Sequence, residues 1–321
     1  MFAPVTVDVA GGPMGGAARF RNEFYRYLAQ TRHGDVKTIG DARRVDPMWL
    51  LQRELATLKR GRRVALNNVG FLAPGGERWT LLANALHFLT KAEIADLHPS
   101  LRPIATRQAS VVRLAARRSD VLIVPCSAMA DRVTSVLPRV SDRICVRMHP
   151  LTPEIVPLSG EGNTILCPVI FEIYKHMVQR LRDWVAAVDG NFDPTVRLIV
   201  TATPGEVPTS LARHPLLEYV GRLPSTELST IWARSRAVFF PSGLESFGFP
   251  LAEARVNGRA VIARETAQNR EIAGHALCGF AVGDTDSLRT AIKRALSIAV
   301  APDPDPFDPD NYFDWMLGIT Q

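Results

Sequence analysis

Short apolar runs alternate with longer amphipathic segments along the sequence, and this alternation most restricts the fold. Runs of β-branched and aromatic residues predict strands near 4–10, 35–40, 63–69, 79–84, 120–124 and 143–147, and again near 164–168, 196–201, 237–240, 260–263 and 278–281. Helical segments separate them, near 17–30, 47–60, 104–118 and 128–137 and then near 175–188, 225–234, 250–257 and 285–298. This order is typical of βαβ units, so the sequence predicts an α/β protein with parallel sheets.

The length of the chain predicts two domains. Its 321 residues exceed what one hydrophobic core usually holds. Residues 148–162 contain three prolines and two glycines, which makes this stretch the best candidate for a hinge. We therefore place the first domain at 1–152 and the second at 153–300, followed by a tail at 301–321.

The most informative segment is 241–253, which reads PSGLESFGFPLAE. It follows the apolar run 237–240, which predicts a buried parallel strand, and it leads into good helix formers. Pro250 suits the first helical position, where its missing N–H costs nothing. The amides of Leu251 and Ala252 would then be free at a helix N-terminus, which attracts a phosphate.

Two carboxylates flank this turn, and they indicate a second chemistry beside the phosphate. Glu245 lies in the predicted loop and Glu253 one turn into the predicted helix. Carboxylates accept hydrogen bonds from hydroxyl groups and repel anions. The pattern therefore predicts a sugar joined to a diphosphate, with one acid on the sugar ring and the other on a ribose.

The motif Glu-x7-Glu with FGFPLAEA resembles the donor site of retaining GT-B glycosyltransferases, specifically glycosyltransferase family four. The resemblance extends to VGRLPSTELSTIWARSRAVFFPS upstream and GRAVIARETAQNREIAG downstream, covers roughly the C-terminal half, and is weaker before it. It implies GT-B architecture, in which two Rossmann-like domains face each other across a cleft. Residues 1–152 would bind the acceptor and 153–300 the nucleotide sugar.

The resemblance also implies the activity. We expect transfer of a sugar from a nucleoside diphosphate sugar, a UDP or GDP sugar, to a hydroxyl acceptor, with retention of configuration and no metal or other cofactor. The acceptor stays open among a polysaccharide, a natural product and a lipid-linked molecule. Two alternatives remain: a catalytically weak or inactive nucleotide-sugar-binding subunit, and a GT-B enzyme that couples or epimerises nucleotide sugars.

For the second domain, the resemblance implies residues that hold the donor. Lys175 would neutralise the diphosphate, but the arginine that accompanies this lysine in similar proteins has no counterpart at 168–170, and Arg222 is our candidate substitute. The backbone at Gly221 would cradle the nucleobase. The remaining predicted donor contacts are in the turn and helix: Glu245, Phe247, Gly248, Phe249, Leu251, Ala252 and Glu253.

In the first domain, the glycine-rich turn after the first strand would approach the donor sugar or the acceptor, and we assign that role to Gly15 and Gly16. Similar proteins place a histidine at a strand end, where it touches the transferred sugar. Alignment of strand ends favours Asn84 here, and residue type favours His87. Ser127 matches a serine of similar chains or caps a helix.

The charges are unevenly distributed along the chain. Residues 1–152 carry 23 Lys or Arg against 12 Asp or Glu, whereas 153–321 carry 15 against 20. A basic half attracts anions, and an acidic membrane surface or a phosphorylated acceptor fits better than nucleic acid, for which no binding motif is present. Four scattered cysteines and the lack of any stretch of about 18 apolar residues predict a cytoplasmic protein, with peripheral membrane contact as an option.

Two further segments have alternative interpretations. The helix predicted within 47–63 carries Met48, Leu51, Leu55 and Leu58 on one face and a basic end; we favour packing of this face on the sheet over contact with an acidic membrane. Residues 302–309 are too rich in proline for regular structure, and we assign no metal to Asp303, Asp305, Asp308 and Asp310. In GT-B proteins the last helix returns to the first domain, and Tyr312, Phe313, Trp315, Met316 and Leu317 offer an apolar face for this.

Overall fold

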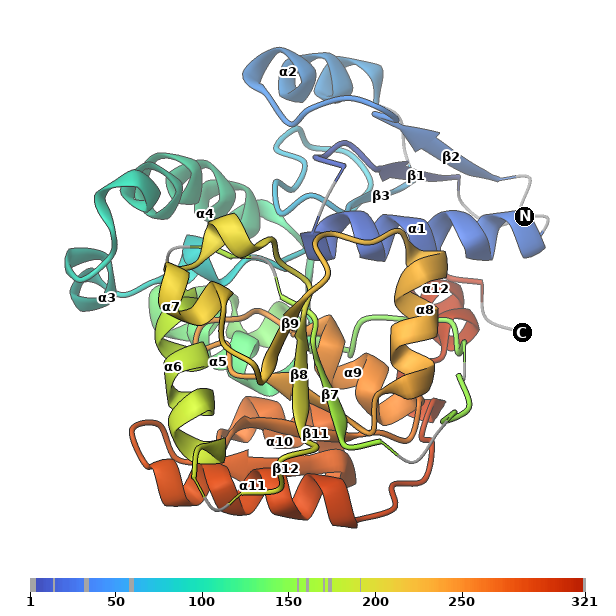
Figure 1. Ribbon diagram of the computed structural model, residues 1–321. Coiled ribbons are helices and arrows are strands. Elements are labelled where there is room, and N and C mark those ends of the chain that lie inside the picture. Colours follow the sequence, from blue (N-terminus) through green and yellow to red (C-terminus); the bar gives the residue numbers. More distant parts are fainter. Residues whose placement is uncertain are drawn as a thin grey trace. The chain divides into compact units, whose positions relative to one another are not determined.

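A computed structural model describes residues 4–13, 15–31, 35–57, 61–154, 156–159, 162–169, 171–172, 175–190 and 192–319. The chain divides into two compact units (Figure 1). Unit 1 comprises residues 1–152 and 306–321, and unit 2 comprises residues 153–305. Each unit has its own sheet and its own core, and each is described separately below.

Unit 1 is built on a sheet of six strands in the order β2-β1-β3-β4-β5-β6, and every pair of neighbours is parallel. The strands are β1 (Val5–Asp8), β2 (Val36–Ile39), β3 (Arg62–Ala65), β4 (Glu77–Leu81), β5 (Val121–Val124) and β6 (Ile144–Val146). The α-helices are α1 (Gly15–Gln30), α2 (Pro47–Ala56), α3 (Lys91–Ala95), α4 (Ala109–Arg118), α5 (Ser127–Val136) and α12 (Pro309–Leu317). There are also 3₁₀ helices, η1 (Ala85–Phe88), η2 (Pro99–Leu101) and η4 (Pro138–Arg143), and a π-helix, η3 (Ile104–Gln108).

The C-terminal helix α12 completes the core of unit 1 by packing on α1. Phe313, which is fully buried, places its ring 5.7 Å from Phe20, 5.3 Å from Phe24 and 5.1 Å from Tyr27, measured between ring centroids. Trp315 lies 4.9 Å from the ring of Trp79 on β4. Aromatic rings bury large areas and prefer tilted and edge-on pairs, so this cluster fixes the end of the chain to unit 1.

Unit 2 is also built on six parallel strands, in the order β12-β11-β10-β7-β8-β9. The strands are β7 (Thr164–Cys167), β8 (Arg197–Val200), β9 (Leu217–Tyr219), β10 (Ala237–Phe240), β11 (Ala260–Arg264) and β12 (Leu277–Phe280). The helices are α6 (Met177–Val188), α7 (Thr209–Ala212), α8 (Ser225–Arg234), α9 (Phe249–Val256), α10 (Ala267–Ala273) and α11 (Thr285–Ser297), with shorter helices η6 (Pro204–Glu206) and η7 (Gly274–Ala276); η8 (Asp305–Phe307) spans the boundary between the units.

The strand order of unit 2 determines where a ligand can bind. From β7 the chain continues to β8 and β9 on one side, and then returns to place β10, β11 and β12 on the other side of β7. The direction in which successive strands are added to the sheet therefore reverses between β7 and β10. In open parallel sheets, ligands bind at the carboxyl ends of the strands beside such a switch point.

The α/β prediction is confirmed, and the eleven predicted strands each correspond to one of the twelve strands found within the described residues. The strand that the sequence analysis missed is β9, which has only three residues. Helices α3, α7 and α10 were also missed, and each has seven residues or fewer. A strand of three residues or a helix of at most seven residues is too short to show its period in the sequence.

The predicted packing of the helix at 47–63 on the sheet is wrong. The structure places Met48, Leu51 and Leu55 on the exposed side of α2 and buries Arg53 on the opposite side. Leu58 lies outside the described residues. The physical reason is the buried carboxylate of Asp8 at the end of β1, which pairs with Arg53 and turns the charged side of the helix inward.

Candidate functional site

The turn between β10 and α9 has a backbone shape that only glycine adopts easily. Gly248 has a φ of +94°, and a Cβ at this position would lie 3.0 Å from Phe240 and 3.1 Å from Leu251. On either side of it, Phe247 and Phe249 stack edge to face with their ring centroids 5.2 Å apart, and Phe247 is buried. The left-handed glycine therefore reverses the chain tightly and starts α9 at Phe249, one residue earlier than predicted.

The predicted free amide at Leu251 is wrong. Its N–H donates to the carbonyl oxygen of Gly248 at 2.9 Å, because the tight turn at Gly248 brings that carbonyl over the first turn of the helix. The side chains of Leu251 and Ala252 are both fully buried. Leu251 therefore packs into the core of unit 2, and a contact between its amide and a phosphate is withdrawn.

Lys175 and Glu245, which the sequence analysis assigned to the same donor, form an ion pair. The Lys175 Nζ lies 2.7 Å from Glu245 Oε1, and the two side chains are only 15% and 18% exposed. Lys175 follows β7 and Glu245 follows β10, so the pair lies at the carboxyl ends of the two strands beside the switch point. A largely buried charge pair therefore lies at this edge of the sheet, in the loops that follow β7 and β10.

Arg264 lies beside the same loop, and the sequence analysis did not select it. It is the last residue of β11, the neighbour of β10, and a Cβ added to Gly243 would collide with its guanidinium. Its Nε is buried without a hydrogen-bond partner among the residues that the structure describes. Burial lowers the pKa of Arg264, and the charge of Arg180 lowers it further. A cation that is partly desolvated and close to another cation is suited to an anionic ligand.

The loop that carries Glu245 is also fastened to α10. The Nε2 of Gln268 donates to the backbone carbonyl of Glu245 at 3.2 Å. Because Gln268 lies on the helix that follows Arg264, the loops after β10 and β11 are held together. The position of Arg264 at the end of a buried strand is the signal that could have identified it from the sequence.

Three other residues were predicted to bind the donor: Glu253, Gly221 and Arg222. Glu253 is half-buried on α9, one turn after Phe249. Gly221 has a φ of +71° and donates its N–H to the carbonyl of Ala202 at 3.0 Å. Arg222 follows the edge strand β9, its guanidinium is 3.8 Å from Glu206, and its side chain is 62% exposed. Since β8 separates β9 from β7, Arg222 is attached two strands away from the strand that precedes Lys175.

In unit 1, Asn84 and His87 are three residues apart in the sequence, and their side chains have different environments. The Asn84 side chain accepts a hydrogen bond from the Leu86 amide at 3.0 Å and begins η1, and it is partly exposed. His87 is buried, and burial lowers its pKa to about 4, with a further lowering by Arg113 and an opposing hydrogen bond with Gln108. The His87 imidazole is therefore neutral at physiological pH.

The remaining predicted positions of unit 1 are at helix starts. Gly15 and Gly16 are the first two residues of α1 and both are exposed; Gly15 has a φ of +79°. A Cβ at Gly15 would meet no atom within 4 Å. Ser127 is the first residue of α5, whose N-cap position is taken by Cys126.

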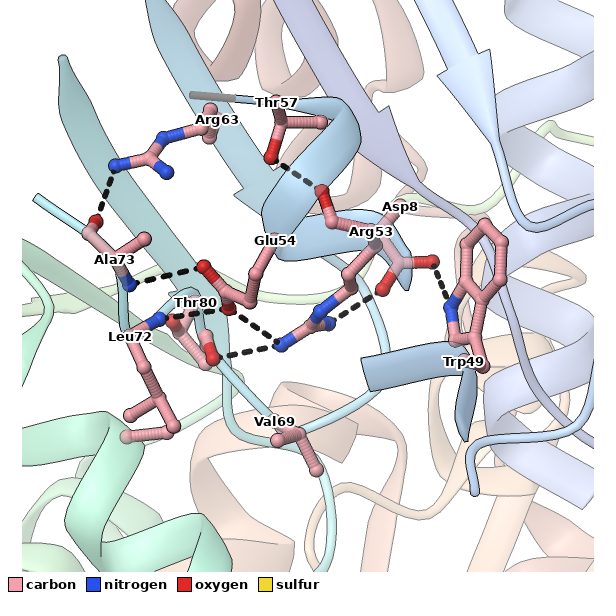
Figure 2. Close-up of polar contacts among 12 residues, drawn as sticks. Asp8, Trp49, Arg53, Glu54, Thr57, Arg63, Val69, Leu72, Ala73 and Thr80 are labelled. Carbon is pink, nitrogen blue, oxygen red and sulfur yellow. Dashed lines mark hydrogen bonds and ion pairs between the residues drawn. The ribbon is translucent and has the colours of Figure 1, made fainter. Parts of the chain in front are cut away.

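A buried acid, Asp8, organises the carboxyl end of β1 (Figure 2). Its Oδ1 accepts from the Ala10 amide at 3.0 Å and from Trp49 Nε1 at 3.2 Å. Its Oδ2 accepts from Arg53 Nη1 at 2.5 Å and from Asn67 Nδ2 at 2.8 Å. Four donors, one of them charged, compensate for the burial of this carboxylate, so we assign Asp8 to the structure of unit 1.

The aspartates of the tail have structural partners. Asp303 accepts from Arg255 on α9, with a shortest distance of 2.6 Å. Asp308 caps α12 by accepting from the amides of Asp310 and Asn311. Within the described ranges, no cluster of three His, Cys, Asp or Glu side chains could hold a metal ion.

Comparison with known families supports the motif. Residues 215–303 match the model of the family described as glycosyl transferases group 1. The matched segment lies within unit 2 and includes Glu245, Arg264 and α9. The predicted resemblance to this family is confirmed over these residues. No curated protein matched the sequence.

Solved structures resemble the whole chain at low sequence identity. WaaG, a glycosyltransferase involved in lipopolysaccharide biosynthesis, matches with a TM-score of 0.64 and 13% identity, over 99% of this chain and 96% of WaaG. The trehalose-6-phosphate synthase OtsA matches with a TM-score of 0.65 and 11% identity, over 99% of this chain and 98% of OtsA. These matches confirm the predicted GT-B fold.

A third match is more partial. The S. aureus TarM G117R mutant, solved in complex with fondaparinux, alpha-GlcNAc-glycerol and UDP, matches with a TM-score of 0.54 and 10% identity. The similarity covers 78% of this chain, and the chain spans half of the TarM chain. Together, the GT-B fold and the matched family model support glycosyl transfer as the class of activity.

Proposed function

We propose that this protein transfers a sugar from a nucleoside diphosphate sugar to a hydroxyl acceptor, with retention of configuration. The observation that carries the proposal is the Lys175–Glu245 ion pair at the switch point of unit 2. It combines a cation suited to a diphosphate with an acid suited to sugar hydroxyls, and both are largely removed from water. The family match over residues 215–303 adds support to this assignment.

The ion pair suggests how the donor is received. A diphosphate would compete with Glu245 for the ammonium group of Lys175 because both are anionic. Once Lys175 contacts the diphosphate, the carboxylate of Glu245 becomes free to accept hydrogen bonds from hydroxyls of the sugar. We assign Glu253 to the ribose and the backbone at Gly221 to the nucleobase.

We propose Arg264, in preference to Arg222, as the second cation at the diphosphate. It adjoins the loop that carries Glu245, whereas Arg222 follows an edge strand and has Glu206 beside it. In the reaction, the bond between the anomeric carbon and the diphosphate oxygen breaks and the acceptor oxygen bonds to that carbon. The leaving diphosphate takes up the proton of the acceptor, so Lys175 and Arg264 act by stabilising its developing charge.

For unit 1, we propose that it binds the acceptor through the exposed start of α1 at Gly15 and Gly16. Between the two candidates near η1, the partly exposed Asn84 is favoured over the buried His87. The neutral imidazole of His87 would then support the local structure.

Donor binding is tested by thermal shift with UDP, GDP, ADP and dTDP sugars, since a ligand that binds the folded state raises its melting temperature. We expect one nucleotide class to raise it in the wild type and not in Lys175→Met. The matched control is Lys293→Met, which removes an exposed lysine of α11 in the same unit and should keep the shift. An equal shift in all three proteins would refute the role of Lys175.

Transfer is tested with a radiolabelled donor and a panel of hydroxyl acceptors. Glu245→Gln should reduce turnover about 100-fold or more with a smaller effect on donor affinity, because the amide is a weaker acceptor for hydroxyls. Arg264→Gln should reduce turnover far more than Arg222→Gln. Donor binding with no incorporation on any acceptor would support the inactive binding subunit, and a changed nucleotide sugar without an acceptor would support coupling or epimerisation.

A further inference from the structure

Helix α2 of unit 1 presents an apolar face outward. Met48, Leu51 and Leu55 are 64%, 58% and 66% exposed, and they are the three most exposed large apolar residues in the described parts of the chain. Their spacing of three and four residues places them on one side of α2. Scattered apolar residues are common on surfaces, but three on one face of a ten-residue helix form a patch.

The orientation of α2 is fixed by the charged residues on its other side (Figure 2). Arg53 is buried, with Nη1 bonded to Asp8 and Nη2 donating to the carbonyl of Gly70 at 2.7 Å. Glu54 accepts from the amides of Leu72 and Ala73 at 2.8 and 2.9 Å. Rotating α2 to bury its leucines would break all of these charge-assisted bonds, so the outward apolar face is a stable feature of unit 1.

The sequence around this face has a modest excess of basic residues, with five Lys or Arg against three Asp or Glu in residues 41–60. Two exposed arginines, Arg43 and Arg44, precede the helix, and so do two exposed acids, Asp41 and Asp46. In the sequence, Lys59 and Arg60 follow it. Residues 1–152 as a whole carry 23 basic against 12 acidic side chains. An apolar strip on a domain with this net positive charge is complementary to a surface that offers both acyl chains and negative headgroups.

We propose that the outer face of α2 docks unit 1 on an anionic phospholipid bilayer. Met48, Leu51 and Leu55 enter the boundary between headgroups and acyl chains, and Arg43 and Arg44 contact the anionic headgroups. No helix within the described residues is long and apolar enough to cross a membrane. Because α2 has ten residues and one exposed apolar side, it lies in the plane of the surface in this contact. This inference concerns unit 1 and does not depend on the proposed donor chemistry of unit 2.

The test is co-sedimentation of the full chain with vesicles of phosphatidylcholine and phosphatidylglycerol in equal parts, compared with vesicles of phosphatidylcholine alone. We expect binding to the mixed vesicles that weakens as salt rises. Leu51→Asn together with Leu55→Asn should lower the partition coefficient at least about tenfold, because each buried leucine contributes strongly to insertion. Val282→Asn, which removes a 43% exposed apolar side chain of unit 2, should bind as the wild type does.

A second variant separates charge from insertion. Arg43→Gln with Arg44→Gln should weaken binding to the mixed vesicles several-fold and leave the melting temperature unchanged. Equal binding of the wild type and the leucine variant, or no preference for anionic vesicles, would overturn the proposal. So would a concentration-dependent dimer that the leucine variant abolishes, since the face would then bind a second copy. A large fall in melting temperature on replacing the leucines would show that the face is covered within the chain.

Discussion

The pairing of Asp8 with Arg53 gives the sharpest test of how unit 1 is held together. The two side chains are 0% and 1% exposed, so neither charge is screened by water. In Arg53→Met, the carboxylate of Asp8 would keep its bonds from Ala10, Trp49 and Asn67 but lose its only cationic partner among the described contacts. Removing one partner of a buried ion pair typically costs about 3–5 kcal/mol. We expect the free energy of unfolding of unit 1 to fall by that amount.

The second variant of the cycle separates the ion pair from simple loss of packing. Asp8→Asn should also destabilise, because it leaves the buried Arg53 with only the more distant carboxylate of Glu54, 3.7 Å from its guanidinium. The double variant should cost no more than either single change, which corresponds to a coupling energy of at least about 2 kcal/mol. Urea unfolding followed by tryptophan fluorescence and far-UV circular dichroism measures these values.

The control is Arg78→Met, which breaks an ion pair that is partly exposed to solvent. Arg78 and Asp120 are 21% and 43% exposed and lie 3.1 Å apart. Their separation should cost about 1 kcal/mol or less. Additive effects of Asp8→Asn and Arg53→Met, or an effect of Arg53→Met no larger than that of Arg78→Met, would refute the buried-pair argument.

Three other changes have defined outcomes. Burial lowers the pKa of His87 from 6.5 to about 4, so the unfolded chain binds more protons than the folded chain between these two pH values. The contribution of His87 to the free energy of unfolding should be complete above pH 6.5 and fall by up to about 3 kcal/mol towards pH 4. Urea unfolding of His87→Gln should show a smaller fall over this range. Phe313→Ala should destabilise unit 1 by about 3–5 kcal/mol in the same assay, since it empties the aromatic cluster under α12. Gly248→Ala should lower the free energy of unfolding of unit 2 by about 2 kcal/mol because Gly248 has a positive φ. The control is Gly205→Ala, whose Cβ would meet no atom within 4 Å and which should change the stability by less than about 0.5 kcal/mol. Equal melting temperatures of the two variants would contradict this prediction.

The sequence predicted the parts of the structure that depend on local pattern. The strand at 237–240 is a continuous apolar run, and the turn after it contains a glycine and a proline at positions that suit a helix start. Glu245 was assigned to the donor from the turn that follows a predicted strand, and Lys175 was assigned to the same donor from the family resemblance. Their direct ion pair required the order of β7 and β10 in the sheet, which no local pattern contains.

Helix α2 shows why periodicity alone can mislead. Its apolar residues have the spacing of a buried face, and the sequence analysis favoured packing for that reason. The deciding partner of Arg53 is Asp8, which lies 45 residues earlier. The burial of a charge is decided by such distant partners, and a hydrophobic pattern does not report them. Arg264 directly follows a predicted strand, which is a signal in the sequence, but its place beside the loop at Gly243 depends on the pairing of β10 with β11.

The path of the chain has a practical consequence for dissecting the protein. Unit 1 is assembled from residues 1–152 and 306–321, so the polypeptide passes between the units twice. A fragment that stops at residue 152 would lack α12, and the rings of Phe20, Phe24 and Tyr27 would lose their contacts with Phe313. Unit 2 can be excised as one continuous piece, but unit 1 has to be joined by a short linker across the gap at 153–305 to be studied alone.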